Sequence, residues 1–237
     1  MYSLDFIVYP SSCNEKGEMK LYDVMQRMQD CSELWLKSEP RYNQYYEENN
    51  RAQLLAYRQL DILRVPKYGE NLRVTTSIYE MNSVFGHRNT NIYDATGQPC
   101  YLSWSMGAFV ERATGHLSKV PQEVIDTLTY DDKTDMEYTD RRIFLPKDKQ
   151  ESCEEFKVMK NDIDYNHHMN NAHYMRIALE VLPENFHFNR VRIEYKVPAR
   201  KGDIIIPKRI ITGADAFIIL YVGEHIGTIF QFCNVDR

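Results

Sequence analysis

The stretch that decides the fold is residues 170–197, NNAHYMRIALEVLPENFHFNRVRIEYKV. Asn170 or Asn171 can cap a helix, and apolar residues then recur at helical spacing until Pro183 ends it: Tyr174, Ile177, Ala178, Val181 and Leu182. In residues 190–197 apolar and charged side chains alternate strictly, which is the period of a half-buried strand. A helix followed by such strands predicts an antiparallel sheet packed against a helix.

The first half of the chain shows the same order. Residues 21–36 have one apolar face, which predicts a helix. Its Met25, Met28 and Trp35 are candidates for lining a binding tunnel, although residues at this spacing more often form plain core. Strands are expected at 55–63, 72–79, 88–93, 101–111, 208–211 and 217–222, with turns at 95–97 and 223–225.

Two copies of one unit explain this repeated order. A strand ending in Val-Pro occurs at residues 65–66 and again at 197–198, each followed by a glycine turn and a further strand. The chain has 237 residues, which suits two ordinary domains. We therefore expect an α+β protein with an N-terminal domain at 1–130, a charged linker at 131–151 and a C-terminal domain at 152–237. Each domain is expected to wrap an antiparallel sheet around a central helix.

Composition excludes several classes of protein. The formal net charge of −5 argues against a nucleic-acid binder that relies on general phosphate attraction. Five widely separated cysteines without a CxxC pair argue against a disulfide framework and fit a cytoplasmic location. The first residues lack the pattern of a signal peptide, and no apolar run reaches the length of a membrane span.

The densest group of polar side chains is residues 161–171, NDIDYNHHMNN, directly before the second helix. The amino end of a helix carries partial positive charge, which suits a developing oxyanion. Asp164, Asn166 and His168 could meet around one bound carbonyl group if the segment is extended or looped. A base on one side of a thioester carbonyl and hydrogen-bond donors on its oxygen are what hydrolysis requires.

Three other interpretations of this segment compete. Asp and Asn residues often do no more than form turns and cap helices. The order Asp162-x-Asp164-x-Asn166 opens like a calcium loop, but His167 and His173 replace the required glycine and glutamate. The same histidines could be zinc ligands, yet no HExxH pattern or cysteine partner accompanies them. Catalysis without a metal ranks above both metal sites.

Residues 164–171, DYNHHMNN, with Tyr174 and Glu180, resemble the active-site segment of the acyl-acyl-carrier-protein (acyl-ACP) thioesterases of plants and bacteria. Trp104, the stretch at 114–121 (TGHLSKVP) and the turn at 66–70 are similar to the first half of that family. The resemblance implies two tandem hot-dog folds, with acyl-chain binding in the N-terminal one and catalysis in the C-terminal one. It implies Asp164, Asn166 and His168 as the catalytic set, with no metal or organic cofactor.

The sequence departs from plant members of the family at one place. Where those carry Glu-Cys, this chain has Pro198-Ala199, which leaves a cysteine mechanism unsupported and a second catalytic carboxylate unassigned. Glu194 lies nearby, but we expect it to be an outward strand residue paired with Arg192 or Lys196. The expected reaction is attack by water, with Asp164 as base or, as a lesser alternative, nucleophile.

The resemblance implies an acyl carrier protein as partner and the release of a free fatty acid that ends chain elongation. Several basic residues are candidates for contacting that acidic partner: Arg141, Arg142, Arg190, Arg192, Arg200, Lys201, Lys208 and Arg209. An acyl-coenzyme A thioesterase and a non-catalytic acyl-binding protein are the alternatives, and hot-dog dehydratases share the architecture. The sequence does not decide acyl-chain length or whether the protein is a homodimer.

Overall fold

A computed structural model describes residues 1–236. Two compact units divide them. The first comprises residues 1–20, 27–58 and 62–138, and the second comprises residues 21–26, 59–61 and 139 onward. The first turns of one helix and three residues of one strand therefore belong to the second unit, although most of each element belongs to the first.

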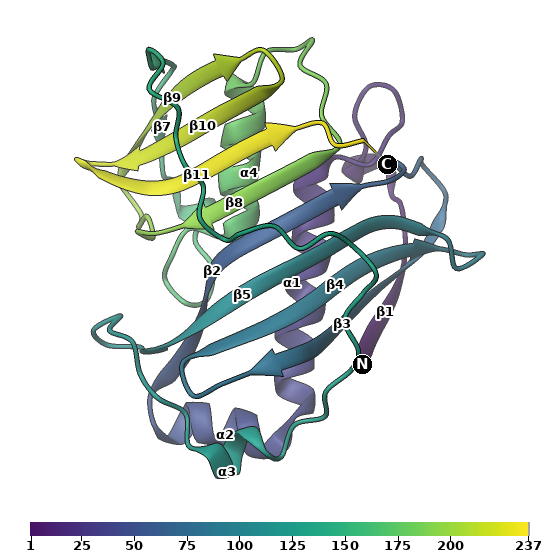
Figure 1. Cartoon of the computed structure of the whole chain (residues 1–237), viewed down its shortest axis with the longest axis vertical. Helices are drawn as coiled ribbons and strands as arrows, with labels where there is room; N and C mark the ends of the chain where they lie inside the picture. The colour runs from purple at the N-terminus through teal and green to yellow at the C-terminus, as the bar shows by residue number, and fades with distance from the viewer. Residues whose placement is uncertain (237) are drawn as a thin grey trace. The chain divides into compact units, whose positions relative to one another are not determined.

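The first unit is an antiparallel sheet with a long helix across one face (Figure 1). Its strand order is β1-β3-β4-β5-β2. The strands are β1 (Tyr2–Ile7), β2 (Arg51–Ile62), β3 (Asn71–Met81), β4 (Phe85–Asp94) and β5 (Pro99–Glu111). The helices are α1 (Leu21–Ser38), α2 (Pro40–Glu48) and the short α3 (Gln122–Ile125), and a 3-10 turn, η1, spans Pro10–Ser12. The predicted helix at 21–36 and the four predicted strands of this half are confirmed, whereas β1 and α2 were not expected.

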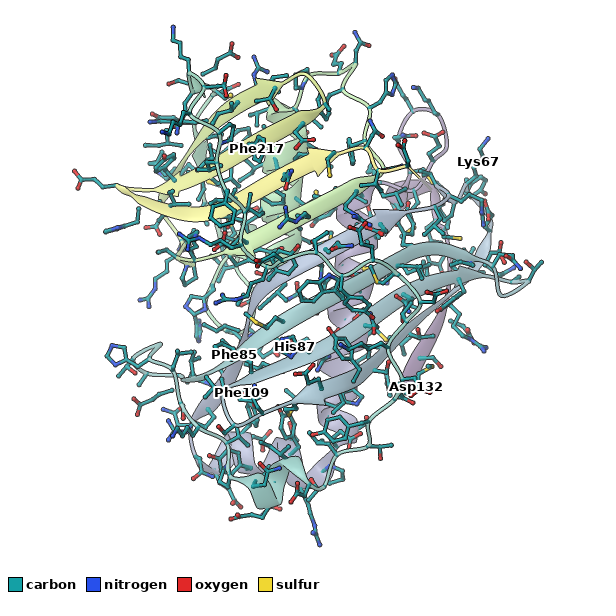
Figure 2. All side chains as sticks on the ribbon, viewed as in Figure 1. Lys67, Phe85, His87, Phe109, Asp132 and Phe217 are labelled. Atoms are coloured by element: carbon teal, nitrogen blue, oxygen red, sulfur yellow. The ribbon has the colours of Figure 1, made fainter. Side chains whose placement is uncertain are left out.

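The inner face of this sheet packs on α1. Trp35 of α1 lies in a buried cluster with Ile78 of β3 and Phe109 of β5, and Figure 2 labels Phe109. Met25 and Met28 are almost fully buried as well. Burial of this apolar face is what holds the helix to the sheet.

The outer face of the same sheet is covered by the segment that follows α3. The Asn89 side-chain oxygen accepts hydrogen bonds from the Tyr138 hydroxyl at 2.9 Å and the Thr134 N–H at 3.1 Å. Trp104 of β5 lies under the same segment, 5.8 Å from the Tyr138 ring centre. Thr75 of β3, which pairs with Asn91 on the same face, is only 8% exposed.

The second unit repeats the arrangement. Its strand order is β8-β11-β10-β9-β6, with β7 also pairing with β9. The strands are β6 (Glu151–Ser152), β7 (Phe156–Lys157), β8 (Arg190–Tyr195), β9 (Ile204–Thr212), β10 (Asp215–Val222) and β11 (His225–Cys233). A 3-10 turn, η2 (Lys160–Asp162), precedes the helix α4 (Asn171–Val181), which lies across one face of this sheet (Figure 1). The pairings of β8 to β11 are all antiparallel.

Helix α4 begins where the sequence predicted. Asn170 caps it, and its side-chain oxygen accepts the N–H of Ala172 at 2.9 Å. The opposite face of the sheet carries a second apolar cluster, in which Phe217 of β10 packs with Ile143 and Ile229. Figure 2 labels Phe217. Both predicted turns of the hairpins hold a glycine at positive φ, Gly97 and Gly223.

The alternation predicted for β8 is wrong at its first residue. Arg190 is 3% exposed rather than solvated, because its guanidinium donates two hydrogen bonds of 2.6 and 2.7 Å to Asp61, which is also buried. A buried charge is tolerated only when it is paired in this way. Within residues 1–236 no helix is long and apolar enough to cross a bilayer.

Candidate active site

The polar segment before α4 folds as a tight hairpin, here called the second hairpin (residues 163–169). Its ends meet at a bridge between Ile163 and Met169. The N–H of Asp164 donates to the carbonyl of His168 at 2.9 Å. The carboxylate of Asp164 accepts the N–H of Asn166 at 2.8 Å and that of His168 at 3.4 Å. The Asp164 carboxylate therefore stabilises the loop by bonding to the backbone of Asn166 and His168, the other two predicted site residues.

His167 and His168 differ in burial because of the backbone. His167 has φ of 62°, a left-handed conformation, and its side chain is exposed. His168 is half-buried. The segment is therefore a loop and not an extended strand. The left-handed backbone at His167 directs its side chain toward solvent. Within residues 1–236 neither the Asn166 amide nor the His168 imidazole makes a side-chain hydrogen bond, so both can serve a ligand.

The electrostatic surroundings keep the His168 imidazole neutral near pH 7. Burial lowers its pKa below the ordinary 6.5, and the cationic Arg200 adds to that effect. Asp164 opposes the shift without reversing it. A neutral imidazole offers one N–H donor and one acceptor, which suits the orientation of a carbonyl or a water molecule.

Ala199, the residue that the sequence analysis compared with a cysteine of the resembling plant proteins, lies after β8 and beside this hairpin. The carbonyl of Ala199 accepts the N–H of Met169 at 2.9 Å, and its own N–H donates to the Tyr174 hydroxyl at 2.7 Å. Ala199 is fully buried and offers no nucleophile. Glu194 pairs with Lys196 at 2.6 Å, as the sequence predicted, and it also accepts the N–H of Ile143.

The calcium interpretation fails on the partners of the carboxylates. One oxygen of Asp162 accepts from His173 at 2.7 Å and from Arg176 at 3.2 Å, and the other accepts the N–H of Met159 at 2.7 Å. This carboxylate thus already accepts three hydrogen bonds, which compete with a cation for its lone pairs. Across residues 1–236 no group of three or more His, Cys, Asp or Glu side chains is placed to hold a metal ion.

The first unit contains a copy of this hairpin at residues 13–19, here called the first hairpin. Asn14 takes the place of Asp164: its side-chain oxygen accepts the N–H groups of Lys16 at 2.9 Å and Glu18 at 3.0 Å. Its N–H bonds to the carbonyl of Glu18 at 2.8 Å, and Gly17 has φ of 71° where His167 has 62°. The preceding 3-10 turns, η1 and η2, and the following helices, α1 and α4, also correspond.

The two copies share a backbone but differ in chemistry. Asn14, Lys16 and Glu18 stand where the second hairpin has Asp164, Asn166 and His168. Because the same turn forms with either set, the fold does not require an acid, an amide and an imidazole there. Unlike the Val-Pro repeat, this repeat was not predicted. Its signal in the sequence is Asn14 and Met19, which match Asp164 and Met169 at equal spacing.

The basic residues do not form one surface. Arg190 is buried, Arg209 pairs with Glu151, and Lys208 stacks on the Tyr221 ring. Arg200 and Lys201 are exposed in a turn that adjoins the second hairpin through Ala199. They remain available to an acidic partner.

Comparison with known proteins identifies the family. The acyl-ACP thioesterase N-terminal domain matches residues 1–128, and the C-terminal domain of the same family matches residues 145–216. The chain belongs to the acyl-ACP thioesterase family. The relationship predicted from residues 164–171 is therefore confirmed.

Plant members of the family are similar over part of the chain. The chloroplastic acyl-(acyl-carrier-protein) hydrolase FATB2 of Cuphea viscosissima is 30% identical over 138 residues, which is 55% of this chain. FATB3 of the same plant is 26% identical over 156 residues, 62% of this chain. These matches span only 33% and 38% of the two plant proteins.

Solved structures of the family share the whole fold. An acyl-ACP thioesterase from Bacteroides thetaiotaomicron superposes with a TM-score of 0.86 at 16% identity, covering 98% of this chain and 96% of its own. A putative oleoyl thioesterase from Lactobacillus plantarum gives 0.85 at 19% identity, covering 100% and 97%. A 12:0-ACP thioesterase from Umbellularia californica gives 0.84 at 16% identity, covering 98% and 92%. The predicted tandem hot-dog fold is confirmed.

Proposed function

We propose that the protein hydrolyses acyl-ACP thioesters to a free fatty acid and the carrier thiol, ending fatty acid chain elongation in the cytoplasm. Membership in the acyl-ACP thioesterase family supports this proposal. The observation that carries it is the second hairpin, which adds Asp164, Asn166 and His168 to a turn that forms equally well without them in the first hairpin. We propose that the N-terminal domain binds the acyl chain and the C-terminal domain catalyses hydrolysis.

In the proposed reaction a water molecule attacks the thioester carbonyl carbon while the Asp164 carboxylate takes its proton. Asn166 and neutral His168 orient the carbonyl oxygen or the water, and the amino end of α4 adds partial positive charge beside the developing oxyanion. The tetrahedral intermediate then expels the thiolate, which takes the proton held by Asp164 and leaves as the carrier thiol. The carbonyl carbon keeps the water oxygen and becomes the carboxyl group.

Burial makes Cys31 and both cysteines of the second unit poor nucleophiles. All five are free thiols, and burial raises the pKa of Cys31 to about 12 and that of Cys233 to about 11. Burial also raises the pKa of Cys153, the remaining cysteine of the second unit. A thiol must lose its proton to attack. We expect iodoacetamide to leave most activity intact, and stoichiometric inactivation that substrate prevents would restore a cysteine mechanism.

Cations around the second hairpin support an acidic carrier as the partner. Lys157 and Lys160 precede the hairpin and are exposed, as are Arg200 and Lys201. The two segments adjoin, because Gly202 donates its N–H to the carbonyl of Val158 at 3.0 Å. Complementary charge speeds association and selects partners.

The deciding experiment compares acyl chains of several lengths on the carrier protein and on coenzyme A. We expect kcat/KM to be higher for the carrier-linked substrates, with Asp164→Asn as the inactive control. Preference for coenzyme A would make the protein an acyl-coenzyme A thioesterase. Tight acyl binding without hydrolysis would make it a binding protein. Sedimentation of the purified protein would decide whether it is a homodimer.

A further inference from the structure

A chain of hydrogen bonds runs beside the second hairpin and is not used by the proposed reaction. Asp162 of η2 bonds to Nδ1 of His173 at 2.7 Å. Nε2 of His173 bonds to the Tyr22 hydroxyl at 3.0 Å, and the Gln26 amide donates to that hydroxyl at 2.9 Å. All four residues belong to the second unit, since Tyr22 and Gln26 lie in the first turns of α1 that are part of it.

Elementary chemistry fixes the donors at the two ends of this chain. The Asp162 carboxylate can only accept, so Nδ1 of His173 carries a proton and donates to it. Nε2 of His173 and the Tyr22 hydroxyl share the next hydrogen bond, and the Tyr22 oxygen accepts the Gln26 N–H. Burial raises the pKa of Tyr22, which keeps its hydroxyl protonated and able to donate. The His173 and Asp162 side chains are only 14% and 11% exposed, so water competes little for these bonds.

The same chain holds both ends of the second hairpin. Asp162 immediately precedes it, and the Asp162 carbonyl accepts the N–H of Asn170, which immediately follows it, at 2.9 Å. His173 lies in the first turn of α4 and donates its N–H to the carbonyl of Asn170 at 2.9 Å. The Asp162 to His173 contact therefore joins the start of the hairpin to the helix at its end.

The first hairpin lacks this device although it has the same backbone. Ser12 stands where Asp162 does, and its carbonyl accepts the N–H of Lys20 at 2.8 Å in the matching bond. Asp23 stands where His173 does. A serine and an aspartate cannot form a carboxylate-imidazole pair. The Asp162–His173 pair thus occurs with the second hairpin, which carries Asp164, Asn166 and His168. The turn itself forms without this pair.

We propose that His173, held between Asp162 and Tyr22, is a positioning residue that fixes the second hairpin in its reactive geometry; this inference rests on the proposed function. The first hairpin shows that this turn forms without the hydrogen-bonded chain. In the second hairpin the chain restricts the positions that the Asp164 and His168 side chains can take. Reaction rates depend steeply on such positions, and a displacement of about 1 Å can cost on the order of a hundredfold.

The test compares Tyr22→Phe, His173→Phe and the double variant with wild type. Tyr22→Phe removes one oxygen and should lower kcat by about threefold to tenfold, whereas His173→Phe should lower it by about thirtyfold to a hundredfold. KM should stay within about twofold in both, because the acyl chain still binds. The double variant should match His173→Phe, since both substitutions break one chain. His225→Asn, at the exposed first residue of β11 in the same unit, is the matched control.

A second measurement does not depend on hydrolysis. Amide hydrogen exchange should quicken by about tenfold or more at residues 163–170 in His173→Phe and stay unchanged at residues 13–19 of the first hairpin. Activity equal to that of His225→Asn, or unchanged exchange at residues 163–170, would overturn the inference. If His173→Phe does not fold, Tyr22→Phe decides by the same two readouts. If wild type hydrolyses no thioester, the proposed function fails and exchange alone decides whether the chain holds the hairpin.

Discussion

Replacing Asp164 by Asn separates the two roles that the structure gives this residue. Its side-chain oxygen organises the second hairpin by accepting the N–H groups of Asn166 and His168. An asparagine oxygen can accept the same two bonds, as Asn14 does in the first hairpin at 2.9 and 3.0 Å. Asp164→Asn therefore keeps the turn and removes only the basic carboxylate.

The expected loss of turnover follows from the proposed base. General base catalysis contributes about a hundredfold to ten-thousandfold in rate. Asp164→Asn should thus lower kcat for acyl-ACP by at least about a hundredfold, equivalent to about 2.7 kcal/mol in the activation barrier. The midpoint of urea unfolding should stay near that of wild type. Steady-state release of free carrier thiol and urea unfolding monitored by fluorescence supply the two measurements.

Alanine gives the matched comparison. Asp164→Ala also loses the two bonds to the backbone, each worth about 0.5–1.5 kcal/mol, so its free energy of unfolding should fall by about 1–3 kcal/mol. Asn14→Ala should show a similar loss of stability with nearly unchanged turnover, because the first hairpin carries no catalytic set. Turnover by Asp164→Asn within about threefold of wild type would refute the role of this carboxylate as base.

Three further predictions concern residues near the site and in the core. Arg200→Gln should move the acid limb of the pH profile of kcat/KM to higher pH. The Arg200 cation lowers the pKa of His168, so its removal lets the imidazole take a proton more easily. An unchanged acid limb would contradict this prediction. His167→Gly should keep turnover and leave the free energy of unfolding equal or higher, because the backbone at this residue is left-handed. His168→Ala should lower turnover strongly. Equal loss of turnover in the two variants would contradict the roles given to these histidines. Arg190→Leu should cost about 3–5 kcal/mol in urea unfolding by removing the guanidinium that balances the buried Asp61 charge. The double variant Asp61→Leu/Arg190→Leu should recover most of that loss.

Local spacing was enough to predict most of the elements. Apolar side chains three or four residues apart predict the helix at 21–36 and the capped helix after Asn170. Apolar side chains two residues apart predict the strand at 190–197. Those periods reflect the geometry of a single element. The proposed site residues Asp164, Asn166 and His168 also lie within five positions of one another, so one segment was sufficient to name them.

Only the tertiary structure decided what each polar side chain meets. Asp61 and Arg190 are 129 positions apart, and Tyr22 and His173 are 151 apart, so no periodic pattern connects them. The sequence placed Arg190 on a solvated face and left His173 as a doubtful metal ligand. Burial in the fold made the first a paired core charge and the second the centre of a hydrogen-bonded chain. Their surroundings come from distant segments, which composition and spacing do not specify.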